Sequence, residues 1–114
     1  MAAKNSDKNQ IEDQKIAKKI FDEVSQIEGV SRFVDVGITK SIANTVFGKS
    51  NALPGIVVSR DDDKLSVALY IKVFFGINIP QLSYDIQTKL KPIISEITES
   101  KIQAINITVE GIDK

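Results

Sequence analysis

The stretch "ANTVFGKSNALPG", residues 43–55, holds the chain's closest approach to a nucleotide-binding motif. Ala43, four residues of any type and then Gly-Lys-Ser at 48–50 fit a loosened phosphate-binding loop. Such a loop surrounds phosphates only when a strand precedes it and a helix begins directly after the Lys-Ser pair. Here alanine replaces the first glycine, and Pro54 follows too closely for a helix. The pattern therefore indicates a loop that leads into a strand.

Carboxylates are the next candidates for chemistry. Three adjacent aspartates occupy positions 61–63, whereas calcium loops space their oxygen ligands at alternate positions and add a distant glutamate. The triplet is typical of a solvated turn between two strands. Asp85, Glu96 and Glu99 show no spacing of a general acid–base pair. We therefore predict no catalytic residue, no metal ligand and no cofactor.

The composition excludes several common enzyme designs. The chain contains no Cys and no His, so thiolate nucleophiles, Ser-His pairs and Cys-ligated zinc cannot be built from it. It has 15 basic and 15 acidic residues, so it lacks the basic excess of most nucleic-acid-binding domains. These exclusions favour a role that is not enzymatic.

The length of 114 residues fits one globular domain, with 42% hydrophobic residues and 26% charged residues. Residues 1–10 are polar and small, and we expect a disordered tail followed by a single domain over 11–114. No signal peptide or apolar run of membrane-spanning length is visible, which predicts a cytoplasmic protein.

Two helices are expected from apolar residues spaced by three and four. The first begins near Ile11, presents Ile16, Ile20 and Val24 on one stripe and stops at Gly29. The second covers residues 80–98, and Pro92 inside it predicts a kink or a break.

Strands are expected in four places. A short strand follows Gly29, and residues 38–54 are irregular, with a loop over "GKSNALPG". A hairpin then joins residues 56–59 to the strictly alternating strand 65–75, whose core face ends at Phe75. The last strand covers 103–110, and if it is parallel to 65–75, the connection through helix 80–98 is a right-handed crossover.

This order, α-β-β-β-α-β, predicts an α+β fold. Two main helices on one face of a small mixed sheet of about four strands form a two-layer sandwich, because that arrangement buries both apolar stripes.

The opposite face of strand 65–75 is the best candidate for an interaction site. Alternation places Tyr70, Lys72 and Phe74 on it. These side chains can stack on a nucleic-acid base, cover a contact between protein subunits, or be shielded by residues 38–54. The zero net charge favours shielding or a protein contact over RNA.

The segment from "GIVVSRDDDKLSVALYIKVFFG" through "INIPQLSYDIQ" to "INITVEGI" resembles the alkaline shock protein family, or Gls-type general stress family, of Gram-positive bacteria. The likeness covers about residues 16–112 and includes "IAKKIFDEVSQIEGVSRF". The resemblance implies a small cytoplasmic or peripherally membrane-associated protein linked to cell-envelope stress. It implies no enzymatic activity and no catalytic residues.

The expected function is therefore a stress-response or envelope-homeostasis role through protein contacts. The expected partners are a second copy of the chain or a membrane-anchoring protein, without direct membrane insertion. The alternative is an RNA-binding module that uses Tyr70 and Phe74.

Overall fold

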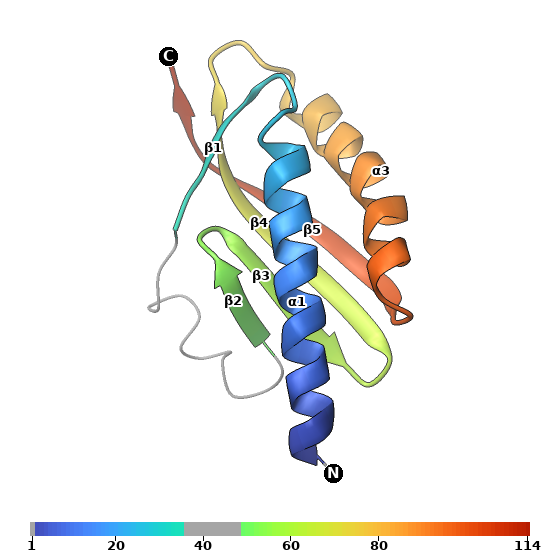
Figure 1. The fold of residues 1–114 in the computed structure, drawn as a ribbon. Coiled ribbons are helices and arrows are strands. Elements are labelled where there is room, and N and C mark those ends of the chain that lie inside the picture. Colours follow the sequence, from blue (N-terminus) through green and yellow to red (C-terminus); the bar gives the residue numbers. More distant parts are fainter. Residues whose placement is uncertain (1, 36–48) are drawn as a thin grey trace.

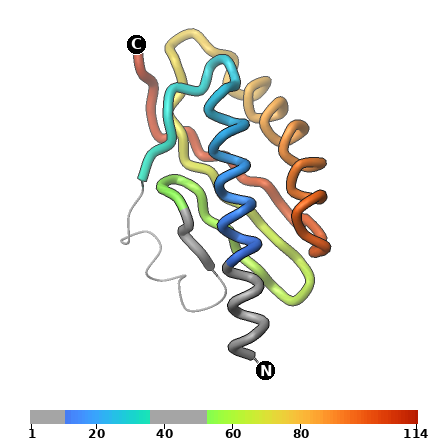
Figure 2. Tube along the Cα trace, viewed as in Figure 1, coloured from blue at the N-terminus to red at the C-terminus, as the bar shows by residue number. Residues whose placement is uncertain are grey.

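A computed structural model describes the backbone of residues 2–35 and 49–114 and the side chains of residues 11–35 and 53–114 (Figure 1, Figure 2). Two helices and five strands make up this part of the chain. In order they are α1 (Ala2–Val24), β1 (Val30–Phe33), β2 (Lys49–Leu53), β3 (Ile56–Asp61), β4 (Lys64–Phe74), α3 (Ile79–Ile97) and β5 (Lys101–Asp113).

β4 is the centre of a mixed five-stranded sheet. β5 pairs with it in parallel along its whole length, which meets the condition for the crossover connection. The antiparallel strands β1 and β3 share the other edge of β4, and β2 extends the sheet beyond β3. The pairing with β3 gives way to the pairing with β1 at Tyr70 of β4. Its N–H donates to the Gly55 carbonyl, and its carbonyl accepts from the Val34 N–H.

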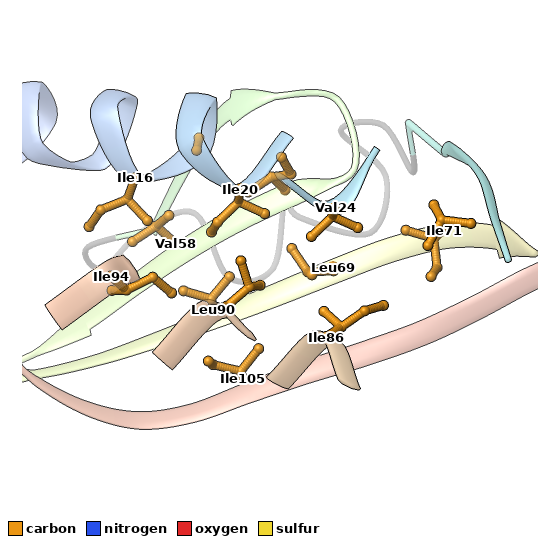
Figure 3. Close-up of a cluster of buried hydrophobic side chains, with 14 of the residues drawn as sticks. Ile16, Ile20, Val24, Val58, Leu69, Ile71, Ile86, Leu90, Ile94 and Ile105 are labelled. Atoms are coloured by element: carbon orange, nitrogen blue, oxygen red, sulfur yellow. The ribbon is translucent and has the colours of Figure 1, made fainter. Parts of the chain in front are cut away.

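Both helices cover the same face of the sheet and enclose the core (Figure 1, Figure 3). The predicted two-layer α+β class is confirmed, with one strand more than the sequence indicated. Fully buried side chains come from both helical stripes and from the odd-numbered positions of β4. They include Ile16, Ile20, Val24, Leu65, Val67, Leu69, Ile71, Ile86, Leu90 and Ile94.

The extra strand, β2, corrects the loop prediction for "GKSNALPG". Residues Lys49–Leu53 pair antiparallel with β3, with Lys49 opposite Ser59 and Leu53 opposite Ile56. Glycine, asparagine and proline in this stretch suggested a loop, but pairing with the edge of β3 determines the backbone conformation. The rest of the irregular segment, residues 38–48, lies outside the described residues.

The end of β4 corrects a second prediction. The alternation over residues 65–73 is confirmed, but Phe75 is not in the core and exposes 77% of its surface. The strand stops at Phe74, and Gly76 with φ of 89° turns the chain away from the sheet. Phe75 therefore lies past the last position at which alternation determines burial.

The helices also differ from their predicted limits. The backbone of α1 is helical from Ala2, where the sequence suggested a tail over residues 1–10; no Gly or Pro interrupts that stretch. α3 starts as expected, with the Asn78 side chain accepting a hydrogen bond from the Gln81 N–H at 3.1 Å. It continues unbroken through Pro92, which is exposed, so the carbonyl that loses its partner lies on the side open to water.

Candidate interaction face

The face of the sheet away from the helices carries the predicted interaction residues, and we call it the outer face. Tyr70, Lys72 and Phe74 all lie on it, because the odd-numbered side chains of β4 between them are buried against the helices. Their exposure differs. Tyr70 is half-buried, whereas Phe74 at the strand end exposes 44% of its surface. Of the two aromatic side chains, Phe74 is therefore the more accessible.

Where β4 pairs with β5, most side chains on the outer face are small or polar. The β4–β5 register places Ser66 beside Ala104, Ala68 beside Asn106 and Tyr70 beside Thr108. Asn106 and Thr108 are exposed. Of the segment that the sequence suggested as a shield, residues 38–54, the part up to residue 48 lies outside the described residues.

A cluster of charged groups lies beside Phe74, and we call it the Asp113 cluster: Ser31, Arg32, Lys72 and Asp113. The Asp113 carboxylate accepts a hydrogen bond from Ser31 Oγ at 2.6 Å and lies 3.4 Å from Arg32 Nε. Its other oxygen is 4.0 Å from Lys72 Nζ. Since the residues come from β1, β4 and β5, the cluster joins three strands at the end of the sheet.

The Asp113 cluster lowers the pKa of Asp113 below its ordinary 3.8, chiefly through the Ser31 hydrogen bond and further through Arg32 and Lys72. The carboxylate is thus held in its charged form, and it offsets the charge of the two cations nearest to Phe74. Sequence reasoning missed this cluster, because Asp113 and Ser31 are 82 positions apart and no local pattern links them.

Ser31→Ala is expected to raise the pKa of Asp113 toward 3.8, because it removes the hydrogen bond that contributes most to the shift. A depressed carboxylate pKa stabilises the fold above pH 3.8, and this stabilisation is lost as the pH falls through the folded-state pKa. A carbon-13 NMR titration of the side-chain carboxyl measures the change. Ser25→Ala, at an exposed serine, is the control, and equal titration of Asp113 in both variants would contradict the assignment.

A second cluster lies on the helix side of the sheet, and we call it the Arg60 cluster: Glu12, Asp13, Arg60, Thr98 and Ser100. Arg60 donates from Nε to Asp13 at 3.0 Å, from Nη2 to Glu12 at 3.0 Å and from Nη1 to Ser100 at 3.1 Å. Thr98 Oγ1 donates to Glu12 at 2.8 Å. The cluster ties α1 to β3 and to the turn between α3 and β5.

Burial raises the pKa of Asp13 from its ordinary 3.8, while the hydrogen bond and the charge of Arg60 oppose the rise. A perturbed carboxyl pKa is one mark of a functional site. Asp13 is only 3% exposed, however, and its carboxylate is held by a guanidinium, which favours a structural role. The sequence did not indicate this cluster, because Arg60 lies 47 positions from Asp13.

The residues of the other candidate sites do not form a binding site in the structure. Lys49 and Ser50 of the nucleotide-like pattern belong to strand β2 and are not followed by a helix, and Gly48 lies outside the described residues. Asp62 and Asp63 form an exposed two-residue turn between the paired Asp61 and Lys64. Within residues 11–35 and 53–114, whose side chains are described, no group of acidic side chains is arranged to hold a metal ion.

The carboxylates that the sequence considered for acid–base work are also separate. Asp85, Glu96 and Glu99 are all exposed, and the Asp85 carboxylate accepts a local hydrogen bond from the Gln81 side chain at 2.8 Å. Neither described helix carries an apolar stretch that would let it cross a membrane.

Three curated proteins illustrate what the chain is similar to. An uncharacterized protein of Bacillus subtilis, YqhY, is 30% identical over 88 residues, which covers 77% of this chain and 64% of the relative. An uncharacterized protein of Streptococcus pyogenes, Spy1535, is 29% identical over 77% of this chain and 65% of its own length. A third, YloU of Bacillus subtilis, is 25% identical over 59% of this chain and 56% of the relative.

The chain thus spans less than two thirds of the length of these relatives. No solved structure matches it significantly. The model of the alkaline shock protein 23 family, described as having a cell envelope-related function, matches residues 1–114. This match confirms the resemblance drawn from the sequence, and the chain belongs to the alkaline shock protein 23 family.

Proposed function

We propose that this chain is a non-enzymatic protein of the envelope stress response that acts through protein–protein contacts. In this proposal it is a cytoplasmic protein that reaches the membrane through a partner and also associates with itself. The family's cell envelope-related description supports the setting. The observation that carries the contact is Phe74, an aromatic side chain 44% exposed on the outer face beside the Asp113 cluster.

The surroundings of Phe74 favour a protein partner over RNA. Single-stranded RNA binding combines exposed aromatics with cations that are available for phosphates. Here Arg32 and Lys72 both approach the carboxylate of Asp113, which offsets their charge. An aromatic beside a fixed ion cluster suits a protein contact, where aromatic side chains carry much of the binding energy.

Phe74→Ser is expected to weaken the affinity for the partner by roughly thirtyfold, which corresponds to about 2 kcal/mol for a buried interface aromatic. Affinity capture from the envelope fraction is therefore expected to recover less of the partner. The reason is that the substitution removes apolar contact area from the outer face and leaves the core intact. The measurement is capture with tagged wild-type chain and tagged variant, followed by quantitative mass spectrometry.

Ile11→Ser is the matched control, because Ile11 exposes 55% of its surface on α1, away from the outer face. Equal loss in both variants, or equal capture by Phe74→Ser and wild type, would refute the assignment to this face. Recovery of RNA that is lost steeply with added salt would favour the nucleic-acid alternative instead.

A further inference from the structure

β5 has the longest strand edge with which no second described strand pairs. β5 spans 13 residues, and among the described strands only β4 pairs with it. An unpaired edge of this length offers a row of backbone N–H and C=O groups to another strand. Stable pairing also requires a partner strand whose side chains complement those of β5.

The sequence of β5, "KIQAINITVEGID", is complementary to itself when reversed about Ile107. In that antiparallel register Lys101 lies opposite Asp113 at both ends of the pair. Between them, Ile102 meets Ile112 and Ile105 meets Val109. Each end thus joins opposite charges, and two of the pairs between the ends join apolar side chains, which are favourable cross-strand combinations.

For the charged and apolar pairs, the register also keeps the two faces of the sheet consistent. Opposed residues of an antiparallel pair must point to the same face. Pairing with β4 places Lys101 beside Lys64 and Asp113 beside Phe74, so both belong to the outer face. Ile102 and Ile112 lie beside the core-facing residues Leu65 and Val73, so both belong to the helix side.

The neighbouring helix and the end of β5 both carry exposed apolar side chains. Gln87 of α3 donates from Nε2 to the Ile105 carbonyl at 2.8 Å, which places this stripe of the helix against β5. Tyr84 lies three positions before Gln87 on the same stripe and exposes 63% of its surface. Ile112, at the end of β5, exposes 55%.

We propose that a second copy of the chain adds to the sheet by antiparallel pairing of β5 with β5, centred on Ile107. This proposal rests on the self-association in the proposed function and specifies its surface. The pairing joins the two sheets edge to edge and makes their outer faces continuous. The Ile105 carbonyl has a second lone pair, so the hydrogen bond from Gln87 does not prevent it.

Cysteine cross-linking tests the register, because the chain has no native Cys to give a background. The probes are two single variants, Asn106→Cys and Thr108→Cys, at exposed outer-face positions that lie opposite each other in the proposed pair. Directly opposed residues are about 5 Å apart, within disulfide range, whereas identical positions are offset diagonally at roughly 7–8 Å. Under mild oxidation, the mixture is expected to form at least fivefold more disulfide dimer than either variant alone.

The control mixture combines Asn106→Cys with Gln26→Cys, at an exposed position in the turn after α1, and is expected to give no excess over the single variants. Sedimentation of the wild-type chain is measured in parallel. A dimer in sedimentation without the preferred Asn106–Thr108 cross-link would overturn the β5 pairing and leave self-association standing. A monomer at all concentrations would overturn both.

Discussion

Gly55→Ala is expected to lower the free energy of unfolding by about 3 kcal/mol, through left-handed backbone strain and a steric clash. Gly55 has a φ of 81° and precedes β3, where β1 and β3 meet on the edge of β4. A Cβ placed on it would lie 2.9 Å from the carbonyl oxygens of both Tyr70 and Val34. Tyr70 belongs to β4 and its carbonyl accepts from the Val34 N–H, so neither backbone group can move away without disturbing that hydrogen bond.

Gly76→Ala is the matched control for this prediction. Gly76 has a similar φ of 89°, but a Cβ there would meet no atom within 4 Å. Its expected cost is about 1 kcal/mol, the conformational part alone. Urea denaturation of both variants measures the difference, and equal losses of stability would show that the close approach at Gly55 contributes nothing.

The parts of the fold that sequence predicted well are those in which burial repeats along the chain. In β4, every second side chain from Leu65 to Val73 is buried, and in α3 the buried residues recur every four positions from Leu82 to Ile94. Each pattern arises because one face of a single helix or strand packs on the core. It is therefore visible in the local sequence of that element. The shared face of Tyr70, Lys72 and Phe74 was predictable for the same reason.

The features that sequence missed depend on partners distant in the chain. β2 is a strand because the edge of β3 accepts it, although its own composition favours a loop. Phe75 is exposed because the strand ends one residue earlier, and alternation does not indicate where a strand ends. Both ion clusters join residues more than 40 positions apart, and single charged residues carry no sign of such pairing.

The two ion clusters differ in burial, and this difference determines what each contributes. The Asp113 cluster is at the surface, where water and salt screen its charges, and Arg32 has a side chain 62% exposed. The Arg60 cluster is enclosed between α1, β3 and the turn after α3, and Arg60 has a side chain only 10% exposed. Charges removed from water are costly unless they are paired, so loss of one partner there is severe.

Arg60→Ala is therefore expected to lower the free energy of unfolding at pH 7 by about 3 kcal/mol, because it leaves the buried Asp13 and the partly buried Glu12 without their cation. Asp13 loses a guanidinium 2.9 Å away, and Glu12 loses one at 3.0 Å. Chemical denaturation measures the effect. Arg32→Ala removes an arginine of the exposed cluster and is expected to change the stability far less.

The pH dependence of the stability difference between wild type and Arg60→Ala distinguishes the loss of charge pairing from the loss of packing. Asp13 has a pKa raised above 3.8 in the folded protein, so its contribution to stability falls as the pH rises through 3.8 toward the folded-state value. Without Arg60 the two effects that oppose this rise disappear, and the pKa of Asp13 is expected to rise further. The stability difference between wild type and Arg60→Ala should therefore shrink on acidification from pH 7 to pH 4. A difference that stays constant over this range would mean that Arg60 stabilises the fold by packing alone.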